Sequence, residues 1–500
     1  MNLIRSTSLL LVAIGTSIAQ SGSCQTAPPP ENSSRLPVSI SVFDRSRIDS
    51  TQWYAATPTP ETYGFVESLV RLGMAQHIKK WDWQLELAAP ATLDLPTDAV
   101  SPVTAQGQLG LGGTYYASNT NNSNPAATFL KQGFARYHFY GKNNVRLGRF
   151  EYFDGQETQP KNPGIAWLQT NRIAQRLIGN FGFSTAQRSF DGAEAHVGSG
   201  NYDITAMAAR ADQGVFNMNG DPELNVDLQY LALTKSTFKD HLLVRAFGMD
   251  YHDGRTGLAK TDNRALATRA ADHKNIRIGT YGGDIAGVAP VGPGRADLLF
   301  WGALQNGQWG ALSHRAGAAA VEGGYQLTKV STAPWLRGGW FRSTGDNNAA
   351  DNKHNTFFQV LPTPRVYAQF PFYNLMNSTD EFVQLVDKPT KKINFRSDLH
   401  WLKLTSSNDL WYQGGGAYDN KVFGYTGRPA NGKSSFSSVL DASVDWQVAK
   451  PVTMTFYYAK SFGKSVIAGI YPSTRNAQYG YVEFLYRWSV PQRPDGPARH

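Results

Sequence analysis

Apolar and polar residues alternate along many segments of this chain, which is the pattern of a β-strand with one apolar face. In the segment 81–90 the odd positions are apolar: Trp81, Trp83, Leu85 and Leu87. The even positions are polar: Asp82, Gln84 and Glu86. Segments of about ten residues with this alternation are typical of the transmembrane strands of a β-barrel.

Two later segments repeat the pattern. The segment from Ile393 has an apolar face, Phe395, Leu399 and Trp401, and a polar face, Asn394, Arg396, Asp398 and His400. The segment from Leu440 has an apolar face, Leu440, Ala442, Val444, Trp446 and Val448, and a polar face, Asp441, Ser443, Asp445 and Gln447. A soluble β-sandwich also alternates, because one face of each sheet covers its core. The alternation alone therefore leaves both architectures open.

The connections between these segments differ in length in a regular way, which favours a barrel in a membrane. Short connections are expected at 141–144, 199–201, 236–240, 405–408 and 449–451, and long ones at 154–187, 211–224, 252–274, 418–435 and 461–476. Outer-membrane barrels carry short turns at the periplasmic end and long loops at the outer end. Segments counted from Phe65 to Trp488 give about 18 strands, so the sequence predicts an all-β, transmembrane antiparallel barrel with a water-filled lumen.

The N-terminus predicts export from the cytoplasm. Arg5, the apolar run 9–14 and the small residues Ser17 and Ala19 form a signal peptide that ends at residue 19. Cys24 is the only cysteine, which excludes an internal disulfide. A lipid anchor on Cys24 is the alternative, but the leucine that usually precedes such a cysteine is missing.

The chain is expected to divide into four parts. These are a signal peptide at 1–19, a flexible periplasmic lead at 20–36, an outer-membrane β-barrel at 37–488 and a C-terminal tail at 489–500. The last strand carries an outward stripe of four residues: Val482, Phe484, Tyr486 and Trp488. Such a stripe places an aromatic residue at the membrane interface.

The charge of the chain bears on its partners. Lys and Arg number 48 and Asp and Glu 39, a formal net charge of +9. Positive charge attracts anionic ligands. Because the exported chain has no blocks of Lys or Arg, no nucleic acid is expected. The expected partners are an acidic polysaccharide or anionic solute, and the outer-membrane lipid around the barrel.

Charged residues that face the lumen are the candidate site. Arginines lie on five predicted strands: Arg136, Arg149, Arg245, Arg337 and Arg396. Arg365 lies in the long connection after Ser343. Four acids are expected to hold these arginines without neutralising all of them: Glu151, Asp191, Glu194 and Asp398. A ring of arginines would form an anion-selective constriction. The alternative is that the ion pairs only satisfy a polar barrel wall.

No arrangement of residues points to catalysis, a metal or a cofactor. Glu151 and Asp154 resemble a glycosidase pair, but such pairs are frequent in a chain of this length. The histidines lack a metal-binding spacing such as His-Glu-x-x-His. The glycine-rich run 110–113 is expected in a strand without a following helix, and 351–354 as a solvated loop tip. We therefore expect a protein that is not an enzyme and needs no cofactor.

Several short motifs resemble the bacterial alginate export family of outer-membrane proteins. They are the run 145–150 (VRLGRF), the stretch 351–358 with 364–368, the segment 392–400 (KINFRSDLH) and the run 409–412 (DLWY). The resemblance covers most of the chain after the signal peptide. It implies a monomeric barrel with an electropositive lumen that passes an alginate-like polyuronate out of the cell. The pore residues that it implies are Arg149, Arg365 and Arg396, with Arg136 and Arg337.

Transport would be driven by a concentration gradient or by periplasmic export machinery, which is a further expected partner. Two other functions remain open at this point. One is an anion-selective or substrate-specific porin for small solutes or oligosaccharides. The other is a secreted β-rich protein that binds or hydrolyses carbohydrate.

Overall fold

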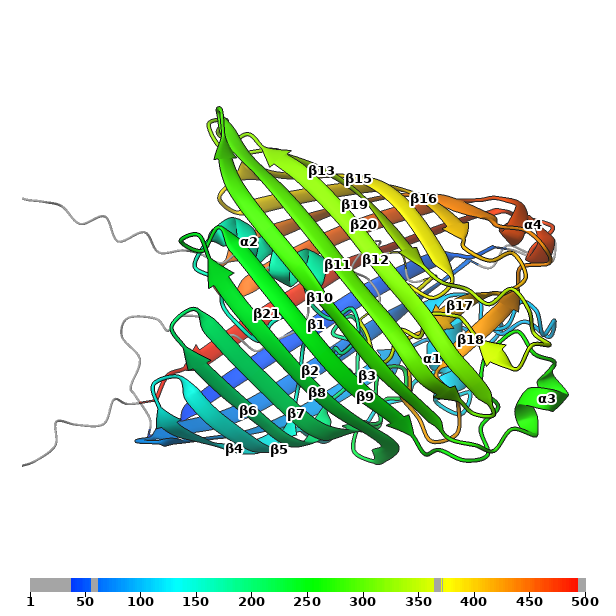
Figure 1. Cartoon of the computed structure of the whole chain (residues 1–500), viewed down its shortest axis with the longest axis horizontal. Coiled ribbons are helices and arrows are strands. Elements are labelled where there is room, and N and C mark those ends of the chain that lie inside the picture. The colour runs from blue at the N-terminus through cyan, green and yellow to red at the C-terminus, as the bar shows by residue number, and fades with distance from the viewer. Residues whose placement is uncertain (1–36, 55–61, 364–369, 371, 493–500) are drawn as a thin grey trace, which may run out of the picture.

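The computed structural model describes residues 37–54, 62–363, 370 and 372–492. Within these ranges 18 antiparallel strands form a closed barrel, because each strand pairs with its neighbour and the first pairs with the last (Figure 1). The predicted barrel of about 18 strands is thus confirmed. The expected signal peptide, the periplasmic lead and residues 493–500 of the tail lie outside the described residues.

The strands have the following bounds. The wall begins with β1 (Ser39–Gln52), β2 (Thr62–Ile78), β3 (Trp81–Leu93), β4 (Phe129–Tyr140), β5 (Asn143–Phe150) and β6 (Phe190–Ser199). It continues with β7 (Tyr202–Asp212), β8 (Glu223–Thr237), β9 (Leu242–Asp253), β10 (Ile276–Val291), β11 (Gly294–Trp309) and β12 (Leu312–Gln326). It closes with β13 (Trp335–Ser343), β15 (Ser378–Thr390), β16 (Ile393–Leu404), β19 (Ser435–Ala449), β20 (Val452–Gly463) and β21 (Asn476–Val490).

Three short strands are not part of the closed ring. β14 (Lys353–His354) pairs with β12 in parallel, and β17 (Leu410–Gly414) pairs with β18 (Tyr425–Pro429) as a separate hairpin. The expected short connection between wall strands at 405–408 is therefore wrong. This segment leads from β16 into the β17–β18 hairpin, and the next wall strand begins only at Ser435. The expected solvated tip at 351–354 is wrong at His354, which is buried and stacks on Trp309 with ring centroids 4.1 Å apart.

The barrel closes between β1 and β21, where Ile40 lies opposite Val490 and Gln52 opposite Gln478. β1 precedes Phe65, where the strand count from the sequence began. Several outward positions of β1 are polar: Asp44, Ser46 and Ser50. The alternation of apolar and polar residues is therefore weak in this strand, although it completes the ring.

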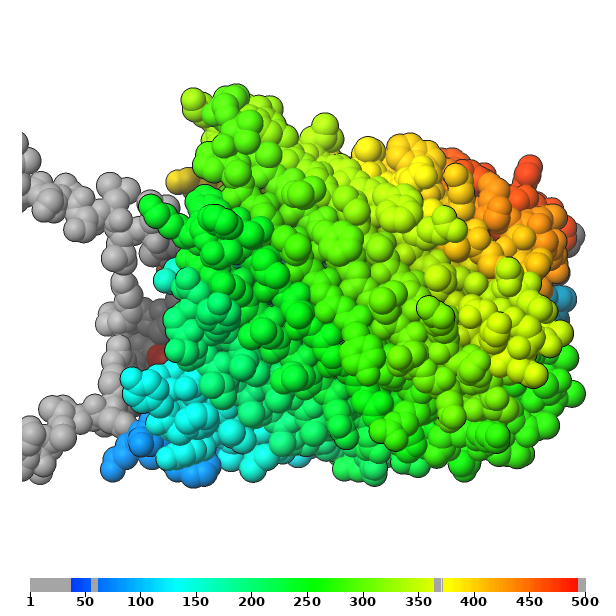
Figure 2. Space-filling model, viewed as in Figure 1, coloured from blue at the N-terminus to red at the C-terminus, as the bar shows by residue number. Residues whose placement is uncertain are grey.

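The predicted alternation sorts side chains between the outer face and the interior. In β3, Leu85 and Leu87 are exposed and Glu86 is buried. The same division is found in β16, β19 and β21. Figure 2 shows the wall over the green strands β8–β12 as a continuous surface. Apolar residues exposed on these strands include Leu231, Tyr281, Leu298, Phe300 and Leu304. Such an apolar outer face is typical of a barrel in lipid.

The two ends of the barrel differ. At one end, which we call the turn end, the connections are 79–80, 141–142, 200–201, 238–241, 292–293, 327–334, 391–392 and 450–451. At the other end, the loop end, the long connections are 94–128, 151–189, 213–222, 254–275, 344–377, 405–434 and 464–475. One loop-end connection, 310–311, is short. Figure 1 shows α1, α3 and α4 gathered at the loop end.

The described helical segments are short and lie in the connections. They are α1 (Leu111–Ser118), α2 (Pro163–Leu168), the π-helical segment η1 (Gln169–Ile173), α3 (Leu266–Ala270) and α4 (Ser465–Ile470). α1 follows Gly110 directly, so the strand expected at 110–113 is wrong. Gly110 has a φ of 89°, which favours glycine, and a Cβ there would lie 2.5 Å from the hydroxyl of Tyr63. Among the described residues, no helix is both long and apolar enough to cross a membrane.

Long connections fill much of the barrel interior. One apolar cluster joins Trp301 of the wall to Phe357 and Phe358 of the connection 344–377 and to Tyr425 of β18. The water-filled lumen expected from the strand number is therefore largely occupied by the chain's own loops.

Leu231 tests whether the outer face contacts lipid. It lies near the middle of β8 and is 54% exposed. Leu231→Arg should lower the free energy of unfolding by about 2–4 kcal/mol, because a guanidinium near the middle of the hydrocarbon is strongly disfavoured. Leu266→Arg is the matched control, since Leu266 is 61% exposed in α3 at the loop end. Urea titration of protein folded into vesicles measures both changes. Equally small losses would show that β8 does not face lipid.

Candidate functional site

Charged residues of the inner wall are buried and paired with one another. In β1, Arg47 contacts Asp49 (Nε–Oδ2 3.1 Å) and Glu67 of β2. A charge removed from water needs an opposite charge or hydrogen bonds, because its burial is otherwise strongly unfavourable. Among the described residues, buried Asp and Glu outnumber buried Arg and Lys. The buried arginines are therefore largely neutralised by the wall itself.

The connection 151–189 starts at the loop end and passes into the barrel toward the turn end, where Figure 1 shows α2. Asn162 caps α2, because its Oδ1 accepts a hydrogen bond from the backbone N of Gly164 (2.9 Å), and Pro163 suits the first helical turn. Apolar residues of α2 then pack on wall residues near the turn end. The cluster includes Ile165, Trp167, Leu168, Leu243, Val288, Leu299 and Trp335.

One carboxylate ties this connection to the wall. Glu322 of β12 accepts hydrogen bonds from Arg172 (Nε–Oε2 2.6 Å) and Arg176 (Nη2–Oε1 3.0 Å) of the connection. Arg337 of β13 contacts Glu322 (3.3 Å) and Asp297 of β11 (2.9 Å). These five residues form the Glu322 cluster. Arg337 faces the interior, as the sequence predicted, but both of its partners are acidic.

Arg396 and Asp398 lie on β16, in the same part of the interior. Arg396 donates from Nε to Oδ2 of Asp398 (2.6 Å), and Gln384 of β15 donates to the other oxygen (2.7 Å). The guanidinium of Arg172 lies 4.6 Å from the ring centre of Phe382 on β15. The fold thus brings Arg337 on β13 and Arg396 and Asp398 on β16 to the same part of the interior as Arg172, with β15 between the two strands.

Glu151 belongs to a different group. It stands at the start of the connection 151–189, directly after β5, and contacts Arg71 of β2 (3.0 Å) and Lys131 of β4 (3.6 Å). Asn180 donates a hydrogen bond to Glu151 (2.9 Å), and Arg71 also pairs with Glu86. Glu151 therefore anchors the inserted connection at β2–β4.

Arg136 lies at the turn end of β4, away from both groups. Its Nη1 is 3.7 Å from Oδ2 of Asp82, and its side chain is partly exposed. Of the predicted arginines on described strands, it is the one nearest to solvent at the mouth of the barrel. Arg365 lies outside the described residues, so its position is not part of this arrangement.

The expected pore position of Arg149 is not where the residue lies. Its neighbours in β5 alternate: Leu147 is exposed on the outer face and Phe150 is buried inside. Arg149 therefore points outward, where it pairs with Asp191 (2.6 Å) and Asp221 (3.3 Å). Similar outward pairs follow on neighbouring strands: Arg210 with Asp227, and Arg277 with Asp250. Arg149 belongs to a charged band on the outside of the barrel.

Sequence reasoning missed the arginines of the inserted connection. Arg188 donates to the carbonyls of Gly179 (3.1 Å), Leu361 (3.0 Å), Gly415 (2.7 Å) and Ala417 (3.1 Å). Burial lowers the pKa of Arg188 to about 10. This one side chain joins three loop-end connections. Apolar residues in a connection expected to be solvated were the available signal, among them Ile165, Trp167, Leu168, Ile173, Leu177 and Ile178.

A cavity of about 390 Å³ lies among the loop-end connections. Eight of its lining residues are aromatic: Phe181, Phe183, Phe216, Phe372, Tyr373, Tyr418, Phe423 and Tyr425. Lys421 and the amides of Gln108 and Gln413 add polar groups. An apolar cavity with a few polar groups is the usual form of a small-ligand site.

The turn end is strongly basic. Its connections carry eight exposed lysines: Lys79, Lys80, Lys142, Lys239, Lys329, Lys391, Lys392 and Lys450. The same connections contain a single acidic residue, Asp240. A second cavity there, of about 330 Å³, is lined by Lys161, Lys239 and Arg295. These lysines lie in tight turns that the sequence predicts, whereas the candidate pore residues predicted from the sequence were arginines, most of them on strands.

The comparisons with known proteins agree with this architecture. A sequence profile described as "Alginate export" matches residues 113–466. The chain belongs to the alginate export family. In structure it is similar to OccAB2 of Acinetobacter baumannii, with a TM-score of 0.57, 10% identity, and coverage of 92% of this chain and 100% of that chain. It is also similar to OccK1 (OpdK) of Pseudomonas aeruginosa, with a TM-score of 0.53, 7% identity, and coverage of 91% and 100%.

None of the curated proteins compared with this chain matches it significantly. Another structure of OpdK, determined with vanillate, has a TM-score of 0.53 and 7% identity and covers 91% of this chain and 100% of that chain. At these identities the solved structures establish the fold alone. With the family, they place the protein in the bacterial outer membrane and support a channel. The family and these neighbours are export or porin channels, not enzymes.

The Glu322 cluster predicts a large loss of stability when its carboxylate is removed. Glu322→Gln leaves Arg172, Arg176 and Arg337 without this counter-charge, and breaking a buried ion pair costs about 3–5 kcal/mol. Glu223→Gln is the matched control, because Glu223 pairs with Arg210 (3.8 Å) on the outer face. An exposed pair contributes about 0–1 kcal/mol. Urea titration of the folded barrel measures both losses. A loss for Glu322→Gln no larger than the control would contradict the cluster's structural role.

Asp154 predicts a pH dependence. Its Oδ1 accepts hydrogen bonds from the backbone N of Ile178 (2.8 Å) and of Leu177 (3.2 Å). Burial raises its pKa from 3.8 to about 7, although the nearby positive charge of Arg245 acts to lower it. Because the folded pKa is the higher one, its stabilising contribution is complete below about pH 4 and is lost as pH rises to about 7, at about 1.4 kcal/mol per pKa unit.

The substitution Asp154→Asn should remove this part of the pH dependence, since an amide keeps the oxygen acceptor and does not ionise. Urea titrations between pH 4 and pH 8 measure the slope for wild type and variant. Asp94→Asn, at an exposed carboxylate of the connection 94–128, is the control and should keep the wild-type slope. Parallel curves for wild type and Asp154→Asn would contradict the assignment.

Proposed function

We propose that this channel passes an anionic saccharide of the polyuronate type from the periplasm to the cell exterior. The observation that carries the proposal is the lysine-rich turn end. Short turns face the periplasm in outer-membrane barrels. Eight exposed lysines around that mouth would concentrate a polyanion there and speed its entry.

The charge is distributed unevenly along the barrel. The inner wall holds its arginines in buried ion pairs, as in the Glu322 cluster. Paired guanidinium groups attract a passing carboxylate only weakly, so a polyanion would be gathered at the mouth and not held tightly inside. A channel needs binding that is favourable enough for entry and weak enough for exit. This proposal thus moves the electropositive region from the lumen wall to the turn end.

The loop-end cavity fits the second half of the path. Aromatic rings offer flat apolar faces, and the C–H faces of a pyranose ring are apolar as well, so the two can pack together. Lys421 and the amides of Gln108 and Gln413 offer polar contacts to a carboxylate and to hydroxyl groups. The volume of about 390 Å³ suits one or two sugar rings at a time.

Passage of a chain requires movement of the inserted connection 151–189. This connection is held by Glu322 at one side and by Arg71 and Lys131, through Glu151, at the other. Loop movements in proteins occur on the nanosecond to millisecond scale and need no unfolding of the wall. The proposal therefore includes a closed state, which is the one described, and an open state in which these contacts are broken.

A second candidate is uptake of small ring-shaped solutes. The compact aromatic cavity favours it, since a volume of about 390 Å³ suits a small solute better than a polymer. The solved structure of OpdK with vanillate contains such a solute. The two candidates differ in which end of the barrel should govern selectivity.

The double substitution Lys391→Glu with Lys392→Glu tests the proposal. It replaces two exposed positive charges at the turn end by negative ones, so it should weaken block of single channels by an oligouronate by several-fold and reduce anion preference. Planar-bilayer recordings under a salt gradient measure both quantities, with the oligouronate added to each side in turn. Wild-type block is expected to be stronger from the turn-end side.

The matched control carries the same charge change at the loop end. Lys353→Glu with Lys433→Glu alters two exposed lysines there and should change block from the turn-end side little. Equal effects of the two double variants would contradict the role of the turn end. Anion-conducting channels indifferent to oligouronate, but blocked by a small aromatic carboxylate, would support the second candidate instead.

A further inference from the structure

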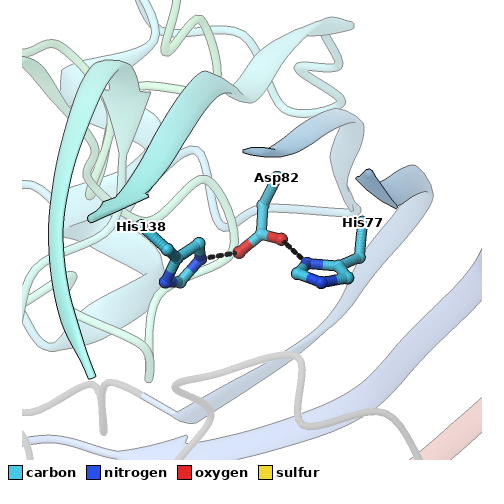
Figure 3. A group of neighbouring side chains, drawn as sticks. All are labelled: His77, Asp82 and His138. Carbon is cyan, nitrogen blue, oxygen red and sulfur yellow. Dashed lines mark hydrogen bonds and ion pairs between the residues drawn. The ribbon is translucent and has the colours of Figure 1, made fainter. Parts of the chain in front are cut away.

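Two histidines and an aspartate meet at the inner rim of the turn end. His77 is the last but one residue of β2, Asp82 is the second of β3 and His138 lies near the end of β4, so the three come from consecutive strands. All three share the inward face with buried residues of the same strands, such as Arg71 and Glu86. Figure 3 shows the carboxylate between the two imidazoles, with one oxygen toward each ring.

The contacts within this group are close. Asp82 Oδ1 contacts His77 Nδ1, and Asp82 Oδ2 lies 2.5 Å from His138 Nε2. One ligand atom from each residue lies within 4.8 Å of those of the other two. A tetrahedral ion with ligand distances of about 2.0–2.2 Å needs its ligand atoms about 3–3.5 Å apart. Both imidazoles are partly exposed, so they have room to rotate toward a shared ion.

The backbone holds the three residues in place. His77 and Asp82 lie directly opposite each other across the turn 79–80. The backbone N of His138 donates to the carbonyl of Lys80 (2.7 Å). Gln492, after the last strand, binds both the N (2.7 Å) and the O (2.8 Å) of His77. A set of ligands fixed in this way loses little conformational freedom when an ion binds.

We propose that His77, Asp82 and His138 bind a divalent transition-metal ion, with Zn²⁺ as the test ion, at the turn-end mouth of the barrel. Two neutral imidazoles and one carboxylate are a common protein ligand set for Zn²⁺, Cu²⁺, Ni²⁺ and Fe²⁺ and a poor one for Ca²⁺ or Mg²⁺. His77 has a side chain 61% exposed, so the ion would keep one or more positions open to water. The proposal is independent of the transported substrate.

Arg136 makes the site sensitive to its surroundings. Its guanidinium lies 3.7 Å from Asp82 and competes with a cation for that carboxylate. A cluster that is only structural would instead hold its two imidazoles by hydrogen bonds to Asp82 and would not take up an ion.

The experiment uses the mature chain folded in detergent, stripped of metal and without a polyhistidine tag. Zn²⁺ titration against a competing chromophoric chelator should give one saturable site per chain. His77→Ala and His138→Ala should each raise the dissociation constant more than about tenfold, because each removes a ligand. Arg136→Gln should lower it, because a competing positive charge is removed. Such a gain in affinity would not follow from a structural role.

His196→Ala is the matched control. His196 faces the interior two strands further along and pairs with Asp203 (Nε2–Oδ2 2.9 Å), and no other imidazole of the described residues pairs with that carboxylate. This variant should bind Zn²⁺ as the wild type does. Electron paramagnetic resonance of bound Cu²⁺ should show two coordinated nitrogens in the wild type and one in His138→Ala. No saturable binding by the wild type, or binding unchanged by both His77→Ala and His138→Ala, would overturn the proposal.

Discussion

Inside a bilayer no water is available to hydrogen-bond the peptide groups, and this constraint determines the rest of the structure. A sheet can satisfy it only by closing on itself, which the pairing of β1 with β21 achieves. Because successive side chains point to opposite faces of a strand, closure also divides the sequence into a lipid-facing and an interior set. The apolar outer surface and the charged inner wall are two results of one backbone requirement.

The charged inner wall in turn determines what can fill the barrel. A ring of this size encloses more space than wall side chains can occupy, and the charges cannot be left dry and unmatched. The connection 151–189 meets both needs, since it brings apolar residues from α2 and arginines from η1 and the segment after it. At the turn end no connection among the described residues covers the lysines, so their charge stays exposed there. The same fold thus pairs the charged residues of the interior and leaves the positive charge of the turn end unpaired by any inserted loop among the described residues.

The sequence was sufficient to predict the barrel, because alternation with a period of two is a local property. It predicted the interior position of Arg337, Arg396 and Asp398 for the same reason. Arg149 was misplaced although the alternation itself is unbroken there, because Arg149 lies two residues after the outward Leu147 and so shares its face of β5. The insertion of residues 151–189 depends on contacts across more than a hundred residues, such as Arg172 with Glu322. The apolar residues of this connection indicate that it is buried, but they do not show which wall residues it contacts. The His77 group was missed because its members become neighbours only through strand pairing.

Arg188 binds carbonyl groups from three connections that lie far apart in the sequence. Arg188 thus links the three connections through one guanidinium group. If one connection moves away, the N–H groups that bound its carbonyls lose their acceptors. Withdrawal of a single loop would leave a buried guanidinium short of acceptors, which is costly. The three loops therefore form one cooperative unit. In the open state proposed above, such a unit would be withdrawn in discrete steps and not gradually, so the current through one barrel should switch between a few fixed levels.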